Sequence, residues 1–308
     1  MEQKIQENEL KISILKKELL SKKIKTYMFW LLFFTEIFII SVVLFKSLNL
    51  EDNSISGDKN VAVINIDKPI TIGYINKLMN DIDKVKNNKK VKEFLVILNS
   101  PGGSPSASEE FSDYLKDLNK HKKVNMYVEG MAASGGYYIA SSIKPLIANK
   151  NAIVGSIGVI MPHINISKLA KKIGIEEDNL YQGEYKEPIS LFHKISDKNE
   201  KYLREHLLTP MYQNFLNTVS KNRGVPVEKL KKFAEGKVYL ANNPKIKGVL
   251  IDKVSALFKV KEEIKNRLGK DTKFFYVNKK LNSLLGGVLS KANINVNLKL
   301  PKSFNDFE

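Results

Sequence analysis

The sequence predicts an α/β domain built on a mostly parallel sheet and preceded by one membrane-spanning helix. Apolar runs typical of buried strands alternate with helical segments from about residue 61 onward. Two glycine-bearing loops each follow a predicted strand directly, at the sheet edge where α/β proteins place their sites. Near the N-terminus, residues 27–45 are almost wholly apolar, which is long enough for a membrane span.

Composition limits the chemistry that is open to the chain. Its 308 residues are 43% hydrophobic and 27% charged, an ordinary balance for a globular protein. It contains no cysteine, which excludes disulfides, thiolate metal sites and a cysteine nucleophile. The histidines show no HExxH or comparable spacing, so we expect no metal site. They are His121, His163, His193 and His206.

The formal net charge of +17 is large. A lysine-rich solvated surface is its ordinary explanation, and attraction to anionic lipid headgroups is the alternative. The sequence contains no aromatic-basic RNA-reading motif and no recognisable helix-turn-helix. We therefore expect no nucleic-acid partner.

Residues 27–45 form the predicted anchor. At ~1.5 Å per residue, a helix of this length reaches about the ~30 Å thickness of a bilayer's hydrocarbon core. A cleaved signal peptide is the alternative, but the region before the apolar stretch is long and no A-x-A-like site follows it. Three lysines crowd its front edge (Lys22, Lys23 and Lys25), so the positive-inside rule predicts a cytoplasmic N-terminus. The domain that follows is then extracytoplasmic in a cell membrane crossed once.

Five parts are predicted along the chain. They are a cytoplasmic segment at 1–26, the anchor at 27–45, a polar linker at 46–60, a folded domain at 61–278 and a C-terminal tail at 279–308.

Strands and helices alternate in the first half of the folded domain, and its second half is mostly helical. The predicted strands are Val61–Ile66, Phe94–Leu98 and Val124–Val128. The predicted helices cover about Tyr74–Val85 and Ser106–Leu118, open again near Ser134, run from Asp197 to Lys221 with an interruption at Pro210, and recur at Val227–Glu235. A last βα-like stretch covers Gly248 to about Tyr276.

The two glycine-bearing loops are Ser100–Gly103 and Ala133–Gly136. A serine between a strand and a helix, flanked by small residues, can be held exposed as a nucleophile. Its successor Gly135 leaves room for a backbone N–H to point at an oxyanion, and the first loop could supply a second donor. Turn formation and close helix packing explain each loop equally well when it is taken alone.

A nucleophilic Ser134 needs a base, and two candidates follow it in the sequence. His163 lies in the segment Gly158–Ile164, which looks like a strand and its exit loop, and would make a Ser-His-Asp protease. Lys186 would make a Ser-Lys dyad, although a solvated surface role is the ordinary one for a lysine. The residues by themselves leave both open.

Four motifs together resemble the signal peptide peptidase A family of Ser-Lys proteases. They are NSPGG (Asn99–Gly103), GMAASGGYYIA (Gly130–Ala140), GSIGVI (Gly155–Ile160) and GEYKE (Gly183–Glu187). The resemblance runs from about Val61 to Val254. It implies a crotonase/ClpP-like fold, a Ser-Lys dyad, no cofactor, and homo-oligomers that form a dome over enclosed active sites.

The resemblance also implies a role for each matching residue. Ser134 is the expected nucleophile, Lys186 the base, and Ser156 is similar to a family serine that hydrogen-bonds the lysine. Backbone N–H groups near Gly102 or Gly103, and at Gly135, are expected to form the oxyanion hole. Gln182 stands where the family often has serine, which leaves the dyad intact but changes its loop.

The sequence thus predicts a membrane-tethered serine endopeptidase that degrades hydrophobic peptides, such as cleaved signal peptides. Lysine with its ordinary pKa of ~10.4 is protonated at neutral pH, so a lysine base must be desolvated. A crotonase-like acyl-CoA enzyme is one alternative, since that fold also uses glycine-loop oxyanion holes. A catalytically inactive scaffold for membrane partners is the other, and the intact Ser134 and Lys186 argue against it.

Overall fold

The computed structural model describes residues 2–49 and 57–277, and the chain divides into two compact units, Met1–Ser56 and Gly57–Glu308. Each unit is described by itself. The predicted tail at 279–308 lies outside the described residues, as do residues 50–56 of the predicted linker.

The first unit is a single helix, α1, which runs from Glu2 to Asn49. Its stretch Ile14–Val42 is long and apolar enough to cross a membrane, and none of that stretch is buried against protein. The predicted anchor at 27–45 overlaps most of this stretch. No helix end marks its predicted borders, because α1 continues through both of them.

The second unit is built on an eight-stranded sheet in the described part of the chain, with the main order β6-β5-β3-β2-β1-β8. All pairs in it are parallel except β5 with β6, so the predicted α/β class is confirmed. The strands are β1 Asn60–Ile66, β2 Val91–Ser100, β3 Val124–Ala133, β4 Leu146–Ala148, β5 Ile153–Gly155, β6 Val238–Leu240, β7 Lys253–Val254 and β8 Lys273–Tyr276.

Strand β3 has two different neighbours on one side. Its first half, Met126–Val128, pairs with β4, and its second half, Met131–Ala133, pairs with β5. The predicted strand ended at Val128, since Glu129 and Gly130 look like a turn. The strand continues because Gly130 leaves room for Asn99 of β2, whose Oδ1 would lie 2.8 Å from a Cβ at this position. The extension carries the chain to Ser134.

Helices cover both faces of the sheet. One face packs on α9 (Leu257–Leu268) through Val260 and Ile264, which join alternate residues of β1, β2 and β3 in a single core cluster. The helices α2 (Ile72–Lys86), α3 (Pro105–His121) and α4 (Gly135–Ala140) bury their own apolar stripes, and α3 and α4 contact β3. The core therefore fixes the strand ends at which the two glycine-bearing loops begin.

The remaining helices follow β5. They are α5 Ser167–Lys172, α6 Asp197–Leu203, the π-turn η1 Arg204–Leu208, α7 Thr209–Arg223, α8 Val227–Lys231 and the short 3-10 turn η2 Pro244–Ile246. The predicted interruption at Pro210 is a π-turn inside one continuous rod rather than a break. Proline has no N–H to bond the carbonyl four residues earlier, so the bonding pattern shifts in the preceding turn.

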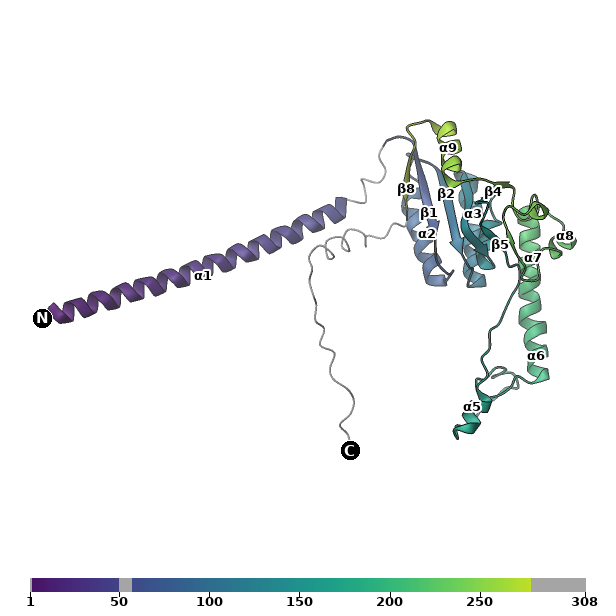
Figure 1. Ribbon diagram of the computed structural model, residues 1–308, viewed down its shortest axis with the longest axis horizontal. Coiled ribbons are helices and arrows are strands. Elements are labelled where there is room, and N and C mark those ends of the chain that lie inside the picture. The colour runs from purple at the N-terminus through teal and green to yellow at the C-terminus, as the bar shows by residue number, and fades with distance from the viewer. Residues whose placement is uncertain (1, 50–56, 278–308) are drawn as a thin grey trace. The chain divides into compact units, whose positions relative to one another are not determined.

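We call residues 159–196 the arm. It leaves β5 and carries α5 to the end of α6 that points away from the sheet, as Figure 1 shows in teal and green. Residues 158–164 contain no strand, which corrects the strand predicted around His163. The apolar residues there have no neighbouring strand to pair with, and Ile160 is 85% exposed.

Candidate active site

Ser134 occupies the sharp turn between β3 and α4. Its backbone has φ 52° and ψ −124°, a conformation that a residue with a side chain rarely adopts. The Ser134 N–H donates to the Gly155 carbonyl at 3.0 Å, and the Ser134 carbonyl accepts from the Tyr138 N–H at 2.9 Å. Such strain persists only where the surroundings hold it, and it is typical of functional positions. The turn leaves the serine partly accessible above the sheet edge.

The first glycine-bearing loop packs directly against this turn. Gly102 has φ 102°, and a Cβ on it would lie 2.9 Å from the Cβ of Ser134 and 2.7 Å from the carbonyl oxygen of Ala133. Only glycine fits this position, for reasons of both space and backbone conformation. The structure thus brings together the two loops that the sequence placed after separate strands.

Some backbone N–H groups of the two loops are hydrogen-bonded and others are not. The Gly102 N–H donates to Ser100 Oγ at 3.2 Å, so it is already occupied. No hydrogen bond from the N–H of Gly103 or of Gly135 is found in the described residues. The Gly103 nitrogen lies 3.3 Å from where a Cβ of Gly135 would stand, so these two groups are neighbours. Gly103 and Gly135 are therefore the donors available for an oxyanion, and Gly102 shapes the loop.

Ser156 lies across from Ser134. Strand β5 pairs Gly155 with Ala133, so the next residue of each strand, Ser156 and Ser134, continue the same register. Ser156 has φ 55°, and its N–H donates to the Lys237 carbonyl at 2.7 Å. One residue further on, Ile157 accepts a hydrogen bond from the Gly236 N–H at 3.0 Å.

Neither candidate base is bonded to Ser134 within one chain. Lys186 lies on the arm and is exposed, and its backbone N–H donates to the Gly183 carbonyl at 3.1 Å. No hydrogen bond of its ammonium group occurs among the described residues. His163 is also on the arm, and its Nε2 is enclosed without a described hydrogen-bond partner. A single chain thus brings together the Ser134 turn and the N–H groups of Gly103 and Gly135, whereas neither Lys186 nor His163 is hydrogen-bonded to Ser134.

Two supporting residues were missed by sequence reasoning. Ser100 occupies the Gly102 N–H, and its own hydroxyl donates to the Lys68 carbonyl at 2.7 Å. Ser108 of α3 lies against Gly135, since a Cβ there would come within 2.3 Å of Ser108 Oγ. Serines at the end of a strand and on a helix carry no distinctive pattern, so only the fold reveals these contacts.

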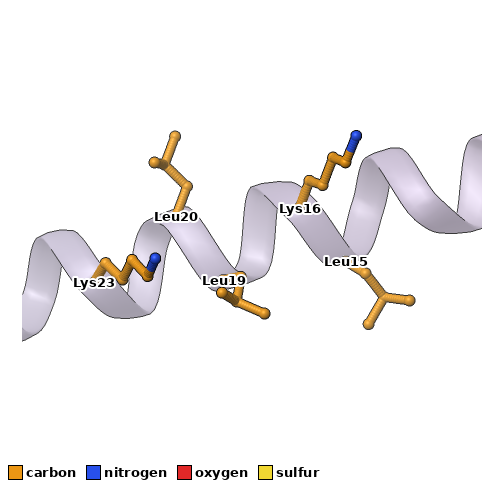
Figure 2. A pocket seen from close by; sticks show the side chains of 5 residues that line it. All are labelled: Leu15, Lys16, Leu19, Leu20 and Lys23. Atoms are coloured by element: carbon orange, nitrogen blue, oxygen red, sulfur yellow. The ribbon is translucent and has the colours of Figure 1, made fainter.

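A shallow surface groove lies on α1, in the other unit. Its lining residues are Leu15, Lys16, Leu19, Leu20 and Lys23, and Figure 2 shows their side chains projecting from different sides of one helix. Side chains of a lone helix cannot enclose a substrate. The groove is therefore not a second candidate for the active site.

Comparison with known proteins agrees with this geometry. Residues 116–270 match peptidase family S49. A protein of Methanocaldococcus jannaschii that is named as a protease is 31% identical over 70% of this chain and 72% of its own length. A protein of Enterococcus faecium that is named as a signal peptide peptidase SppA is 32% identical over 61% of this chain, but over only 55% of its own length.

A further relative is the chloroplastic serine protease SPPA of Arabidopsis thaliana. It is 32% identical over 59% of this chain and over 27% of its own, longer sequence. The S49 match covers half of the chain, including both Ser134 and Lys186, and the fold around Ser134 is of the crotonase/ClpP-like kind. The chain therefore belongs to peptidase family S49 and is a serine peptidase of the SppA type.

Proposed function

We propose that this chain is a membrane-anchored serine endopeptidase that uses a Ser134–Lys186 dyad to hydrolyse hydrophobic peptides at the membrane. The observation that carries the proposal is the strained turn at Ser134 with two unoccupied N–H groups, of Gly103 and Gly135, beside it. The name of the Enterococcus faecium relative suggests the substrate class, namely the remnants of cleaved signal peptides.

The proposed reaction proceeds through an acyl-enzyme. The neutral amine of Lys186 takes the proton of the Ser134 hydroxyl while its oxygen attacks the peptide carbonyl. The N–H groups of Gly103 and Gly135 stabilise the resulting oxyanion. The protonated lysine then gives its proton to the leaving amine. Lys186 next deprotonates a water molecule that attacks the ester, and then returns this proton to the Ser134 oxygen as the acyl group leaves. Ser156 would orient the lysine by a hydrogen bond.

The dyad is proposed to form between two copies of the chain. Lys186 is exposed on an arm that also exposes a set of large apolar side chains. These are Ile160, Ile164, Leu169, Ile173, Ile175, Leu180 and Leu191. A second copy that covers these residues would bury the arm and remove water from the ammonium group of Lys186, which favours its neutral form. Homo-oligomerisation would thus complete the site.

The proposed location is the cell membrane, with the catalytic unit outside the cytoplasm. The apolar part of the stretch Ile14–Val42 of α1, from residue 27 onward, would serve as the anchor. Lys22, Lys23 and Lys25 would stay on the cytoplasmic side, in keeping with the positive-inside rule.

Substitution of each candidate in turn tests the dyad. We expect Ser134→Ala and Lys186→Ala each to abolish cleavage of an apolar peptide while native mass spectrometry finds the oligomer unchanged. His163→Ala should stay active, because Ser134 has a different base. The reverse pattern, with an active lysine variant and an inactive histidine variant, would contradict the proposed Ser134–Lys186 dyad.

Covalent labelling separates this function from its two rivals. A serine-directed covalent inhibitor should modify Ser134, as peptide mass mapping would show, and modification should track the loss of peptidase activity. An acyl-CoA enzyme of crotonase type would act on thioesters and retain that activity in Ser134→Ala. A scaffold would cleave no peptide even when correctly assembled.

A further inference from the structure

The loop that carries Lys186 has no helix or strand of its own. Residues 175–195 are irregular, and a turn from Gly183, whose φ is +107°, to Lys186 places the lysine. The Lys186 side chain is exposed and makes no hydrogen bond with the described residues. The position of the Lys186 ammonium group therefore depends on the contacts that fix the rest of this loop.

An aromatic stack joins the loop to α6. The ring of Tyr185, the residue directly before Lys186, stacks on Tyr202 with centroids 4.3 Å apart and planes 20° apart. The ring of Tyr202 also lies against the ring of His206, at 5.0 Å between centroids and a tilt of 35°. Tyr202 thus lies between the two other rings, and it is half-buried.

A charged contact supports the same attachment. Lys198 forms an ion pair with Glu184, and its Nζ lies 5.6 Å from the centre of the Tyr185 ring. The hydrogen bond to Glu184 raises the pKa of Lys198, so Lys198 stays positively charged. An exposed ion pair of this kind contributes little stability by itself. The ring stack is the stronger of the two attachments.

The two helix residues that contact the loop, and the histidine beside them, lie on one side of the helix. Lys198, Tyr202 and His206 follow each other at intervals of four residues, which places them in one row along the helical rod. The row begins at a well-formed helix start, where the Ser196 hydroxyl accepts from the Asn199 N–H at 3.2 Å. The loop is therefore fixed to a rigid element, in addition to its own internal bond from the Asn179 amide to the Glu187 carboxylate at 2.9 Å.

We propose that Tyr202 is the positioning residue for Lys186. Its ring holds Tyr185, and through the backbone of that residue it sets the position from which Lys186 reaches Ser134. The inference rests on the proposed function, since it takes Lys186 as the base. Tyr202 itself touches neither substrate nor Ser134.

A loss of the ring should reduce the chemical step rather than substrate binding. A displacement of ~1 Å in a catalytic group can cost about 100-fold in rate. We expect Tyr202→Ala to lower kcat by about 10- to 100-fold and to leave KM within about twofold. Tyr202→Phe keeps the stack and should stay within about twofold of the wild type in both constants.

The experiment compares the full-length variants, each purified as an assembled oligomer that native mass spectrometry has verified. Lys201→Ala is the matched control, because Lys201 is exposed on the same helix outside the row of three. Lys186→Ala is measured in the same series, together with the rate at which a serine-directed covalent inhibitor labels Ser134. The labelling rate should fall in Tyr202→Ala and not in Tyr202→Phe or Lys201→Ala.

Each result decides one of the two proposals. An inactive Lys186→Ala together with a fully active Tyr202→Ala overturns the positioning role alone. Equal losses in Tyr202→Ala and Tyr202→Phe, or a rise in KM that matches the fall in kcat, overturn it as well. A Lys186→Ala variant that keeps its activity overturns the proposed dyad, whatever the tyrosine variants do.

Discussion

Gly135, next to Ser134, has no room for a methyl group. A Cβ there would lie 2.3 Å from Ser108 Oγ but 3.4 Å from Ser108 Cβ, so the hydroxyl is the obstacle. We expect Gly135→Ala to destabilise the fold by about 1–3 kcal/mol, the usual cost of overpacking, and to reduce activity because the oxyanion donor is displaced. Urea denaturation and peptide cleavage measure the two effects.

The double variant Gly135→Ala/Ser108→Ala tests the cause. Removal of the Ser108 hydroxyl leaves the two Cβ atoms at an ordinary van der Waals distance of 3.4 Å. Most of the stability lost in Gly135→Ala should therefore return. Ser108→Ala alone serves as the reference for the cycle. Additive losses in the two single variants would show that another contact makes Gly135 necessary.

The sequence predicted that the two glycine-bearing loops lie together at Ser134, but not which of their N–H groups are already bonded. The turn at Ser134 could be predicted because a serine with small residues on both sides follows an apolar strand. The choice between Gly102 and Gly103 could not be made, since it depends on Ser100 Oγ occupying one N–H. A hydrogen bond from a backbone N–H to a nearby serine hydroxyl leaves no pattern in composition or spacing.

At the scale of elements, an ion pair between a buried arginine and a half-buried aspartate fastens the end of α7 to the region of β7. The side chain of Arg223 is 0% exposed and donates to both carboxylate oxygens of Asp252, at 2.9 Å and 2.8 Å. Burial by itself would raise the pKa of Asp252, but the hydrogen bonds from Arg223 and from the Leu146 N–H outweigh it, and the pKa lies below its usual value. The folded state therefore binds this proton less readily than the unfolded chain does.

The stability that the Arg223–Asp252 pair contributes should depend on pH. Because the pKa of Asp252 is lowered by folding, the contribution is complete above the unfolded value of ~3.9 and is lost as the pH falls through the folded value. We expect Asp252→Asn to cost about 3 kcal/mol at pH 7 and to flatten the decline of stability in acid. Urea denaturation at several pH values measures both.

Lys231→Ala provides a comparison, since Lys231 pairs with Glu228 on the exposed surface of α8. It should change the free energy of unfolding by less than about 1 kcal/mol. If Asp252→Asn behaved like this control at every pH, the buried pair would have no special role in stability.

Element borders were the less predictable part of the fold. The strand starts at Val61 and Val124 were predicted to within one residue, because apolar runs begin there. The end of β3 was not, since Gly130 looks like a turn until Asn99 is placed beside it. The π-turn before Pro210 was predicted only as an interruption. A sequence shows that proline lacks an N–H, but not how the hydrogen bonds of the helix rearrange around it.

At the scale of the whole molecule, the exposed arm predicts that catalysis needs two chains. Ser134→Ala and Lys186→Ala proteins are each inactive on their own in this scheme. When they are mixed under conditions that allow subunit exchange, some interfaces should pair an intact Ser134 with an intact Lys186. We expect activity to return to a fraction of the wild type, measured by peptide cleavage.

The control for this mixing is Ser134→Ala combined with the double variant Ser134→Ala/Lys186→Ala, which contains no intact serine and should stay inactive. Native mass spectrometry verifies that mixed oligomers form. An inactive first mixture in spite of mixed oligomers would place the dyad within one chain and contradict the scheme. The exposure of Lys186 supports the prediction, yet a sequence alone gives no sign of which surfaces of a fold meet another copy.

The backbone bonds beside Ser156 also bear on how freely the arm can change in length. The chain leaves the sheet at Ile157 and returns at Gly236, and these two residues are hydrogen-bonded to each other. The free-energy cost of bringing these two ends together depends only weakly on how many residues separate them. Each doubling of a flexible loop adds only about 0.6 kcal/mol to that cost. Residues inserted after Leu180, which is 99% exposed, should therefore leave the strands around Ser134 undisturbed. Because the contact of Tyr185 with Tyr202 lies after the insertion, Lys186 should keep its place as well, so the arm can vary in length without changing either residue.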